Sequence, residues 1–323
     1  MAIITIGLSC FDQFFYINRW PKENTKNFSS DFIESGGGPC ANAAWLLGLW
    51  GECVYFSGHL QNDIYGQKII DEFHDVGVNT DYVIFNNQML TPLASILVNQ
   101  LNGSRTIITR KQNYPPRMTF EEKLKIDELI THLTYDDKKE VITILIDGHE
   151  PELSEYIIQR MPDARVVMDA GSLRESNLNL AKYTDYLVAS ENFACELSGI
   201  EKFTSDIQLN EALTELNKLS RGQPFITLGE RGCAYLKNGI PTISPAFICN
   251  AIDTTGAGDV FHGAFTYGVH YNWHIDNIIL FASLAAAISV EKKGVRESIP
   301  DLADVHNAIN QYERSREKYF TSF

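Results

Sequence analysis

The residues of this chain best suited to chemistry stand in one short run, Asp253-Thr254-Thr255-Gly256-Ala257-Gly258-Asp259. Apolar residues recur at helical spacing behind this run, so we expect a helix to begin near Gly256 and a short strand over residues 245–252. The first N–H groups of a helix lack partners within the helix, and the helix dipole adds partial positive charge there. Because glycine lets an anion approach the backbone closely, this turn predicts a phosphate-binding site.

Asp259, in the first turn of the expected helix, has two interpretations. A carboxylate at this end of a helix stabilises it by roughly 0.3–1 kcal/mol, which is a purely structural role. Beside an anion-binding turn, the same carboxylate could remove the proton of a hydroxyl group while backbone amides hold a phosphoryl group. The residues of the turn leave both interpretations open.

The run that ends at Asp259 resembles the signature of the ribokinase family, the PfkB-type carbohydrate kinases. The similarity covers nearly the whole chain and includes three further segments: Gly36-Gly37-Gly38 to Asn42, Thr227 to Gly232, and Lys293-Gly294 with Ser298-Ile299-Pro300. The resemblance implies ATP-dependent phosphorylation of a sugar hydroxyl group, with Asp259 as the base. The backbone amides of Gly256, Ala257 and Gly258 would stabilise the transferred group, and Mg²⁺ would neutralise charge on the phosphates.

The resemblance also assigns site residues outside the signature. For the sugar they are Asp12, Gly37, Gly38 and Asn42. Arg110, at the edge of an expected hairpin, and His149, at the end of an expected strand, are further candidates by their position alone, and a solvated or structural role is their alternative. For the nucleotide they are Ser190, Thr227, Gly229, Gly232 and the alanine-rich wall that includes Ala286. Glu191 is the candidate acid near magnesium, and a monovalent cation such as K⁺ would be held by Asp253, Thr255, Ser289, Gly294 and Ser298.

Two positions depart from the ribokinase pattern. Pro39 stands where ribokinases have lysine, and Ser190-Glu191 stands where many members have Asn-x-x-Glu. These departures, together with Ser104-Arg105-Thr106-Ile107, look more like ketohexokinase and sulfofructose kinase. We therefore expect a ketohexose or a related sugar as the acceptor, with ribose, a 2-keto-3-deoxy sugar acid or a nucleoside as alternatives. A non-catalytic sugar sensor and a purely structural protein are rival functions from other classes.

The rest of the chain predicts an α/β fold. Expected strands alternate with expected helices, which indicates three layers, αβα, around a mostly parallel sheet. Two hairpins, over residues 14–34 and 91–110, predict a small β-sheet lid, which in this family shields the phosphoryl donor from water. We expect the main domain over residues 1–13, 37–90 and 114–323, and the lid over 14–36 and 91–113. Unpaired lid edges favour a homodimer.

Composition narrows the classes of protein further. The chain has 323 residues and a formal net charge of −14, which argues against nucleic acid as a partner. Its six cysteines have no zinc spacing, and neither a P-loop motif nor a dinucleotide-binding glycine pattern follows the first strand. Residues 1–7 do not have the pattern of a signal peptide, and the longest apolar run is too short to span a membrane. We expect a cytoplasmic enzyme that does not contact a membrane.

Overall fold

The computed structural model describes residues 1–110, 117–134 and 141–320, and its main feature is an eight-stranded sheet. The strand order is β14-β13-β12-β11-β10-β9-β1-β4. The strands from β4 to β12 are parallel, whereas β13 and β14 are antiparallel additions at one edge. The bounds are β1 (Ala2–Ile6), β4 (Val54–Ser57), β9 (Ile142–Ile146), β10 (Arg165–Ala170), β11 (Tyr186–Ser190), β12 (Gln223–Thr227), β13 (Cys233–Lys237) and β14 (Ile240–Ser244).

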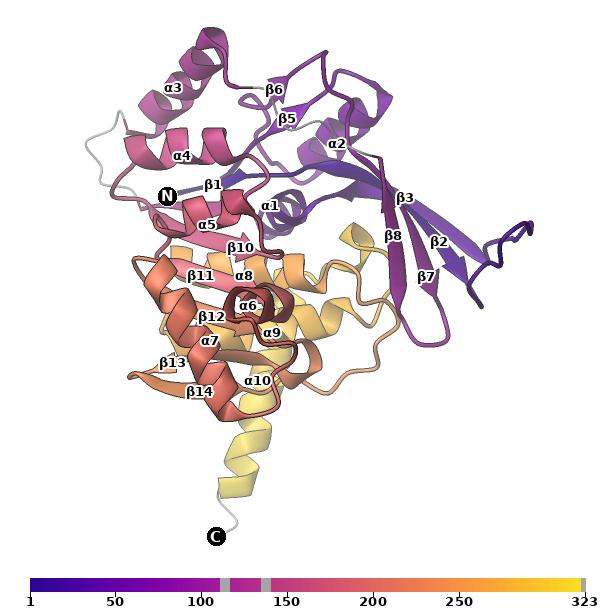
Figure 1. Cartoon of the computed structure of the whole chain (residues 1–323), viewed down its shortest axis with the longest axis vertical. Helices are drawn as coiled ribbons and strands as arrows, with labels where there is room; N and C mark the ends of the chain where they lie inside the picture. The colour runs from indigo at the N-terminus through magenta and orange to yellow at the C-terminus, as the bar shows by residue number, and fades with distance from the viewer. Residues whose placement is uncertain (111–116, 135–140, 321–323) are drawn as a thin grey trace.

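Helices cover both faces of this sheet, so its parallel strands are apolar on both sides. One layer consists of α1 (Pro39–Leu49), α8 (Ala257–His270) and α9 (Ile275–Ser289), with α10 (Leu302–Phe320) against α9. The other consists of α3 (Phe120–Thr134), α4 (Pro151–Arg160), α5 (Glu175–Ala181), α6 (Glu191–Ser198) and α7 (Asp206–Leu219). Consecutive residues of a strand therefore pack into different hydrophobic cores, one on each face of the sheet, as Ile3 and Ile4 do. Figure 1 shows the layers, with α10 extending beyond the body.

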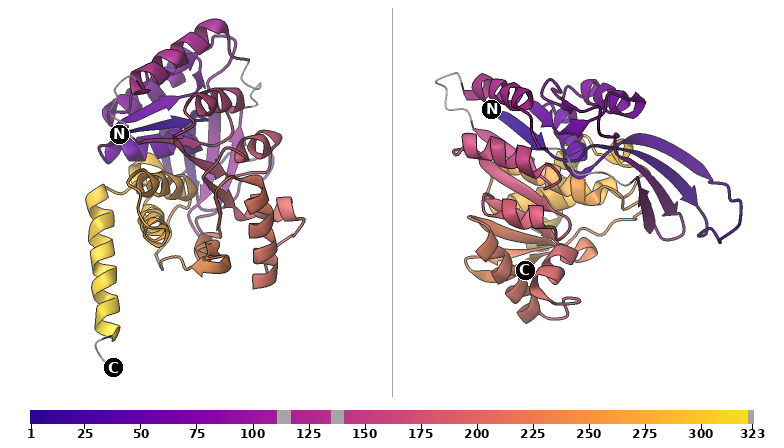
Figure 2. Two further views of the ribbon diagram at one scale, coloured as in Figure 1. Left: turned by 90° about the vertical axis from the view of Figure 1, so that its left-hand side faces the viewer. Right: turned by 45° about the horizontal axis from the view of Figure 1, so that its top comes forward.

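A second sheet of four strands has the order β3-β2-β7-β8. Its strands are β2 (Cys10–Ile17), β3 (Asp31–Gly37), β7 (Leu93–Asn99) and β8 (Arg105–Thr109). The two hairpins join through parallel pairing of β2 with β7, and α2 (Ile64–Asp75) packs against β2 and β3. A short two-stranded sheet pairs β5 (His59–Leu60) with β6 (Ile84–Phe85). Figures 1 and 2 show the four strands projecting from one side of the body, and we call this sheet the lid.

The predicted fold class is confirmed, and several element predictions need correction. The strand expected over residues 245–252 does not form, because β14 is the edge of the sheet and offers the following residues no partner strand. Asp12 lies inside β2 rather than in a loop after β1, so the lid sheet begins at Cys10. Helices α5 and α6 were not predicted, and both are short, with 7 and 8 residues.

In the ranges that the structure describes, none of the helices is both long enough and apolar enough to span a bilayer.

Candidate active site

The turn into α8 has the geometry of an anion-binding site. Gly256 precedes the helix with a left-handed φ of 77°, and a Cβ atom there would lie 2.5 Å from Val295 Cγ1. Gly258 is exposed, and a Cβ atom added to it would meet nothing within 4 Å. Among the described residues, none accepts a hydrogen bond from the backbone N–H of Gly258 or Asp259. The predicted amide of Ala257 instead donates to the carbonyl oxygen of Thr254 at 3.5 Å. The amides of Gly258 and Asp259 are therefore the ones available to an anion.

Asp259 is the carboxylate beside these amides. Asn42, in the first turns of α1, donates from Nδ2 to Asp259 Oδ2 at 2.6 Å. Burial and then the charge of Asp169 raise the pKa of Asp259 to about 7, and the hydrogen bond from Asn42 opposes the rise. A carboxylate with a pKa near neutrality can accept a proton from a substrate more readily than an ordinary aspartate can.

Asp12 supplies a second buried carboxylate, from the lid strand β2. It is 7% exposed, and burial raises its pKa to about 6, while a hydrogen bond from Cys10 and the charge of Arg296 oppose the rise. A Cβ atom at Gly37 would lie 1.9 Å from Asp12 Oδ2, so only glycine fits beside this side chain. The charge of Asp12 also contributes to the raised pKa of Asp259 after burial and Asp169, which places the two predicted residues within electrostatic reach.

Three buried polar atoms near these residues have no hydrogen-bond partner in the described part of the chain. They are Asn42 Oδ1, Ser9 Oγ and Ser35 Oγ. Ser35 pairs with Asp12 across the lid sheet, and Gly38 packs against the backbone of Ser9. A ligand with several hydroxyl groups would satisfy such atoms. Ser9 and Ser35 were not predicted, although Ser9 follows the first strand and Ser35 directly precedes the glycine run.

Asp169 and His262 form a buried pair behind the anion-binding turn. His262 Nδ1 lies 3.3 Å from Asp169 Oδ2 and 2.6 Å from the carbonyl oxygen of Gly258. Asp169 is the second-last residue of β10, and burial raises its pKa. His262 was not predicted, because one histidine on a helix carries no signal until its neighbours are known.

The predicted nucleotide residues lie at the carboxyl ends of neighbouring strands. Ser190 of β11 pairs with Thr227 of β12, and Gly229 follows with a positive φ of 59° and open space around it. Gly232 has a φ of 101°, and a Cβ atom there would lie 2.0 Å from the carbonyl oxygen of Ser244. Ser190 Oγ also caps α6. Ala286 is a half-buried residue of α9. Ligand sites of open parallel sheets occur at such strand ends.

Two predicted sugar contacts are engaged with the protein itself. Arg110 donates from Nη2 to the carbonyl oxygen of Thr91, and Lys111 lies outside the described residues. His149 Nε2 lies 2.7 Å from Arg174 Nη1, and burial lowers the pKa of His149. Contact of Arg110 or His149 with a substrate remains a prediction.

The residues present do not build a magnesium site of their own. Glu191 forms an ion pair with Arg231 at 2.5 Å, which engages the predicted acid. In residues 1–110, 117–134 and 141–320, no three His, Cys, Asp or Glu side chains come together to hold a metal ion. We therefore derive no step through a protein-bound magnesium ion.

The predicted monovalent-cation residues are only partly brought together. Asp253 and Gly294 are adjacent, since Gly294 N donates toward Asp253 Oδ2 at 3.3 Å. The hydroxyl groups of Ser289 and Ser298 donate to the carbonyl oxygens of Ala286 and Val295. These hydrogen bonds do not test the backbone carbonyl oxygens of residues 294–298, which the resemblance implies as ligands. Thr255 Oγ1 is buried and has no partner among the described residues. One orphaned oxygen does not by itself fit a cation cage, which needs several.

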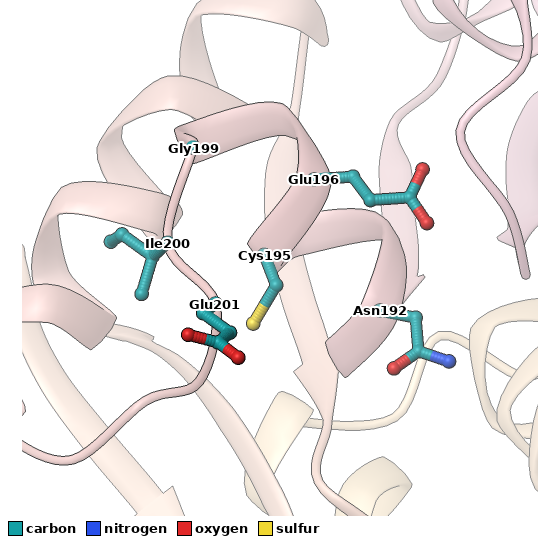
Figure 3. Close-up of a pocket in the computed structure, with 6 residues that line it drawn as sticks. All are labelled: Asn192, Cys195, Glu196, Gly199, Ile200 and Glu201. Atoms are coloured by element: carbon teal, nitrogen blue, oxygen red, sulfur yellow. The ribbon is translucent and has the colours of Figure 1, made fainter.

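A surface hollow of about 390 Å³ lies on α6 and the residues that follow it (Figure 3). Its lining residues are Asn192, Cys195, Glu196, Gly199, Ile200 and Glu201. None of these residues was predicted for the site, and we assign the hollow no function.

A mostly parallel sheet with a lid, and a turn with exposed amides beside a buried carboxylate of raised pKa, are typical of phosphotransferases that act on small hydroxyl compounds. The profile described as "pfkB family carbohydrate kinase" matches residues 3–302. The chain therefore belongs to the pfkB family of carbohydrate kinases. It is an ATP-dependent enzyme that phosphorylates a sugar hydroxyl group.

Similar proteins extend over nearly the same length. A deoxyribokinase of Salmonella typhi is 27% identical over 316 residues, which cover 97% of this chain and 100% of that protein. A ribokinase of Lactococcus lactis is 26% identical and covers 96% of this chain and 98% of that protein. The structure of Arabidopsis thaliana ribokinase complexed with ribose and ATP has a TM-score of 0.76 at 24% identity, covering 94% of this chain and 97% of that one.

Proposed function

We propose that this enzyme transfers the γ-phosphoryl group of ATP to a hydroxyl group of a ketohexose or a related sugar. The observation that carries the proposal is the contact of Asn42 Nδ2 with Asp259 Oδ2 at 2.6 Å, with Asn42 Oδ1 left free. A sugar hydroxyl group that donates to Asn42 Oδ1 would lie beside the carboxylate that must take its proton. Asp12 lies within electrostatic reach of Asp259 and would accept hydrogen bonds from other hydroxyl groups of the same sugar.

The proposed reaction uses the chain's own groups in two ways. Asp259 accepts the hydroxyl proton as the sugar oxygen attacks the γ-phosphorus, and the bond from phosphorus to the bridging oxygen of ADP breaks. The free backbone amides of Gly258 and Asp259 donate to the oxygens of the transferred group, where negative charge must be stabilised. Magnesium, carried on the nucleotide phosphates, would supply further charge neutralisation.

Ribose or deoxyribose is the second candidate acceptor. The observation in its favour is that the relatives named above are a deoxyribokinase and ribokinases, aligned over nearly the full length of this chain. The observation in favour of a ketohexose is the departure from the ribokinase pattern at Pro39 and at Ser190-Glu191. A few polar contacts decide such specificity, so turnover must distinguish the two.

The first prediction is tested with purified enzyme, MgATP and a panel of D-fructose, D-ribose, 2-deoxy-D-ribose and a 2-keto-3-deoxy sugar acid. We expect turnover to be highest with a ketohexose and to fall by about 10²–10⁴-fold in Asp259→Asn, since a general base is lost. The matched control is Asp163→Asn, which changes an exposed aspartate. Tight sugar binding without ADP formation would support a sensor instead, and unchanged turnover in Asp259→Asn would remove Asp259 from the mechanism.

Two further proposals concern assembly and ions. We propose a homodimer formed through the lid, whose edge strand β8 is exposed along its whole length.

A requirement for K⁺ at Asp253 also remains a proposal. Comparing turnover in potassium and in tetramethylammonium salts tests it.

A further inference from the structure

Tyr16 connects the lid to the signature turn through a single hydroxyl group. It lies in β2 and is 1% exposed. Its hydroxyl donates to Asp253 Oδ2 at 2.8 Å and accepts from Gly294 N at 2.7 Å. A tyrosine hydroxyl is protonated at neutral pH, so it can donate one hydrogen bond and accept another. These contacts join segments more than 230 residues apart in the chain, since Tyr16 and Asp253 differ by 237.

Asp253 links Tyr16 to the anion-binding turn, because its two carboxylate oxygens accept hydrogen bonds from both sides. Its other oxygen, Oδ1, accepts from the backbone N–H of Thr255 at 2.9 Å, one residue before Gly256. Val295 makes a parallel apolar connection, because it packs in the same buried cluster as Tyr16 and its side chain touches Gly256. The position of Tyr16 therefore affects the position of the turn whose amides are exposed.

The same lid strand carries Asp12. Asp12 and Tyr16 are four residues apart, so both point to one face of β2, about 13 Å apart along the strand at about 3.3 Å per residue. A strand paired on both sides, as β2 is with β3 and β7, moves as a unit. A movement of β2 at Asp12 would thus also move Tyr16.

We propose that Tyr16 is a positioning residue that aligns the amides of the anion-binding turn when β2 engages the sugar through Asp12. The inference rests on the sugar-kinase function proposed above. In it, Tyr16 touches neither substrate. It acts through Asp253 and Gly294, so its hydroxyl should matter for the rate of transfer more than for sugar binding.

Tyr16→Phe tests the proposal, because the ring keeps its packing and only the hydroxyl is lost. With MgATP and the sugar of the panel that wild type turns over fastest, we expect kcat to fall by about 10- to 100-fold, as for loss of a hydrogen bond to a charged group. The KM for the sugar should stay within about threefold. Tyr65→Phe is the matched control, since its ring packs on Phe11 of the same strand at 5.1 Å, and we expect wild-type kinetics.

Two measurements separate positioning from a general loss of packing. The double variant Tyr16→Phe, Asp253→Asn should be no slower than Asp253→Asn alone, because both changes break one connection. Amide hydrogen exchange should increase in peptides that cover residues 250–260 in Tyr16→Phe, and it should stay unchanged in peptides of α4 and α7. Additive rate losses, an unchanged kcat, or an increase in exchange across the whole molecule would each overturn the proposal.

The exchange experiment needs no substrate, which keeps the two proposals distinguishable. If wild type phosphorylates no sugar of the panel while exchange still rises only in residues 250–260, the connection stands and the proposed function fails. If sugars are phosphorylated but Tyr16→Phe changes neither kcat nor exchange, the function stands and the role of Tyr16 is wrong.

Discussion

Asp259 and Asn42 show how a short contact between two side chains can set the chemistry of a site. The hydrogen bond of 2.6 Å fixes one carboxylate oxygen, and burial followed by the charge of Asp169 holds the pKa near 7. In the proposed role of base, Asp259 is active when deprotonated. The rate should therefore rise with pH through the neutral range and fall as the pH drops below the pKa of Asp259.

Asp169→Asn makes this electrostatic account testable. Removing the charge of Asp169 takes away the second-largest cause of the raised pKa, so the pKa of Asp259 should fall. The acidic limb of the kcat/KM profile, measured between pH 5 and pH 9, should then move to lower pH. Asp163→Asn serves again as the control, because it changes an exposed aspartate. An acidic limb that does not move in Asp169→Asn would show that Asp169 does not influence the base.

Among the elements, the short helix at Arg296–Ser298 and helix α2 both contact the glycine run Gly36-Gly37-Gly38. Arg296 is 3% exposed, forms an ion pair with Glu72 of α2, and lies against Gly36, where a Cβ atom would be 2.3 Å from its Nη1. Glu72 also accepts from the backbone N–H of Gly36 at 2.9 Å. The conformation of Gly36, which precedes the neighbour of Asp12, Gly37, thus depends on the ion pair between Arg296 and Glu72.

Glu72→Gln should destabilise the fold, because it removes the ion-pair partner of the buried Arg296 guanidinium. Breaking a fully buried pair costs about 3–5 kcal/mol, and the 28% exposure of the Glu72 side chain reduces the expected loss to about 2 kcal/mol. Glu34→Gln, which breaks the exposed pair with Lys68, should cost less than about 1 kcal/mol. Urea unfolding of both variants measures the difference, and equal losses would contradict a special role for Glu72.

At the scale of the whole molecule, the lid presents an edge strand and apolar side chains to solvent. Every residue of β8 is exposed, and Ile108 is 62% exposed. An exposed strand edge with apolar side chains favours pairing with another chain. This arrangement is the physical basis for the proposed homodimer.

Ile108→Lys should shift the protein from dimer to monomer. A charge on the edge strand of the expected interface would have to be desolvated on association. Ile240→Lys is the control, since Ile240 is 66% exposed on β14, at the far edge of the main sheet. Analytical ultracentrifugation of wild type and both variants distinguishes the states, and a monomeric wild type would remove the proposal.

The sequence by itself determined the α/β fold class, the helix that begins after Gly256 and the membership of a carbohydrate kinase family. These features depend on periodicity, glycine placement and a specific motif, which are local properties of the chain. Only the tertiary structure decided that Asp12 belongs to a lid strand, that His262 meets Asp169, and that Tyr16 reaches Asp253. Such contacts join segments from about 90 to 237 residues apart, so they arise from the way the layers and the lid pack together, which no local pattern encodes.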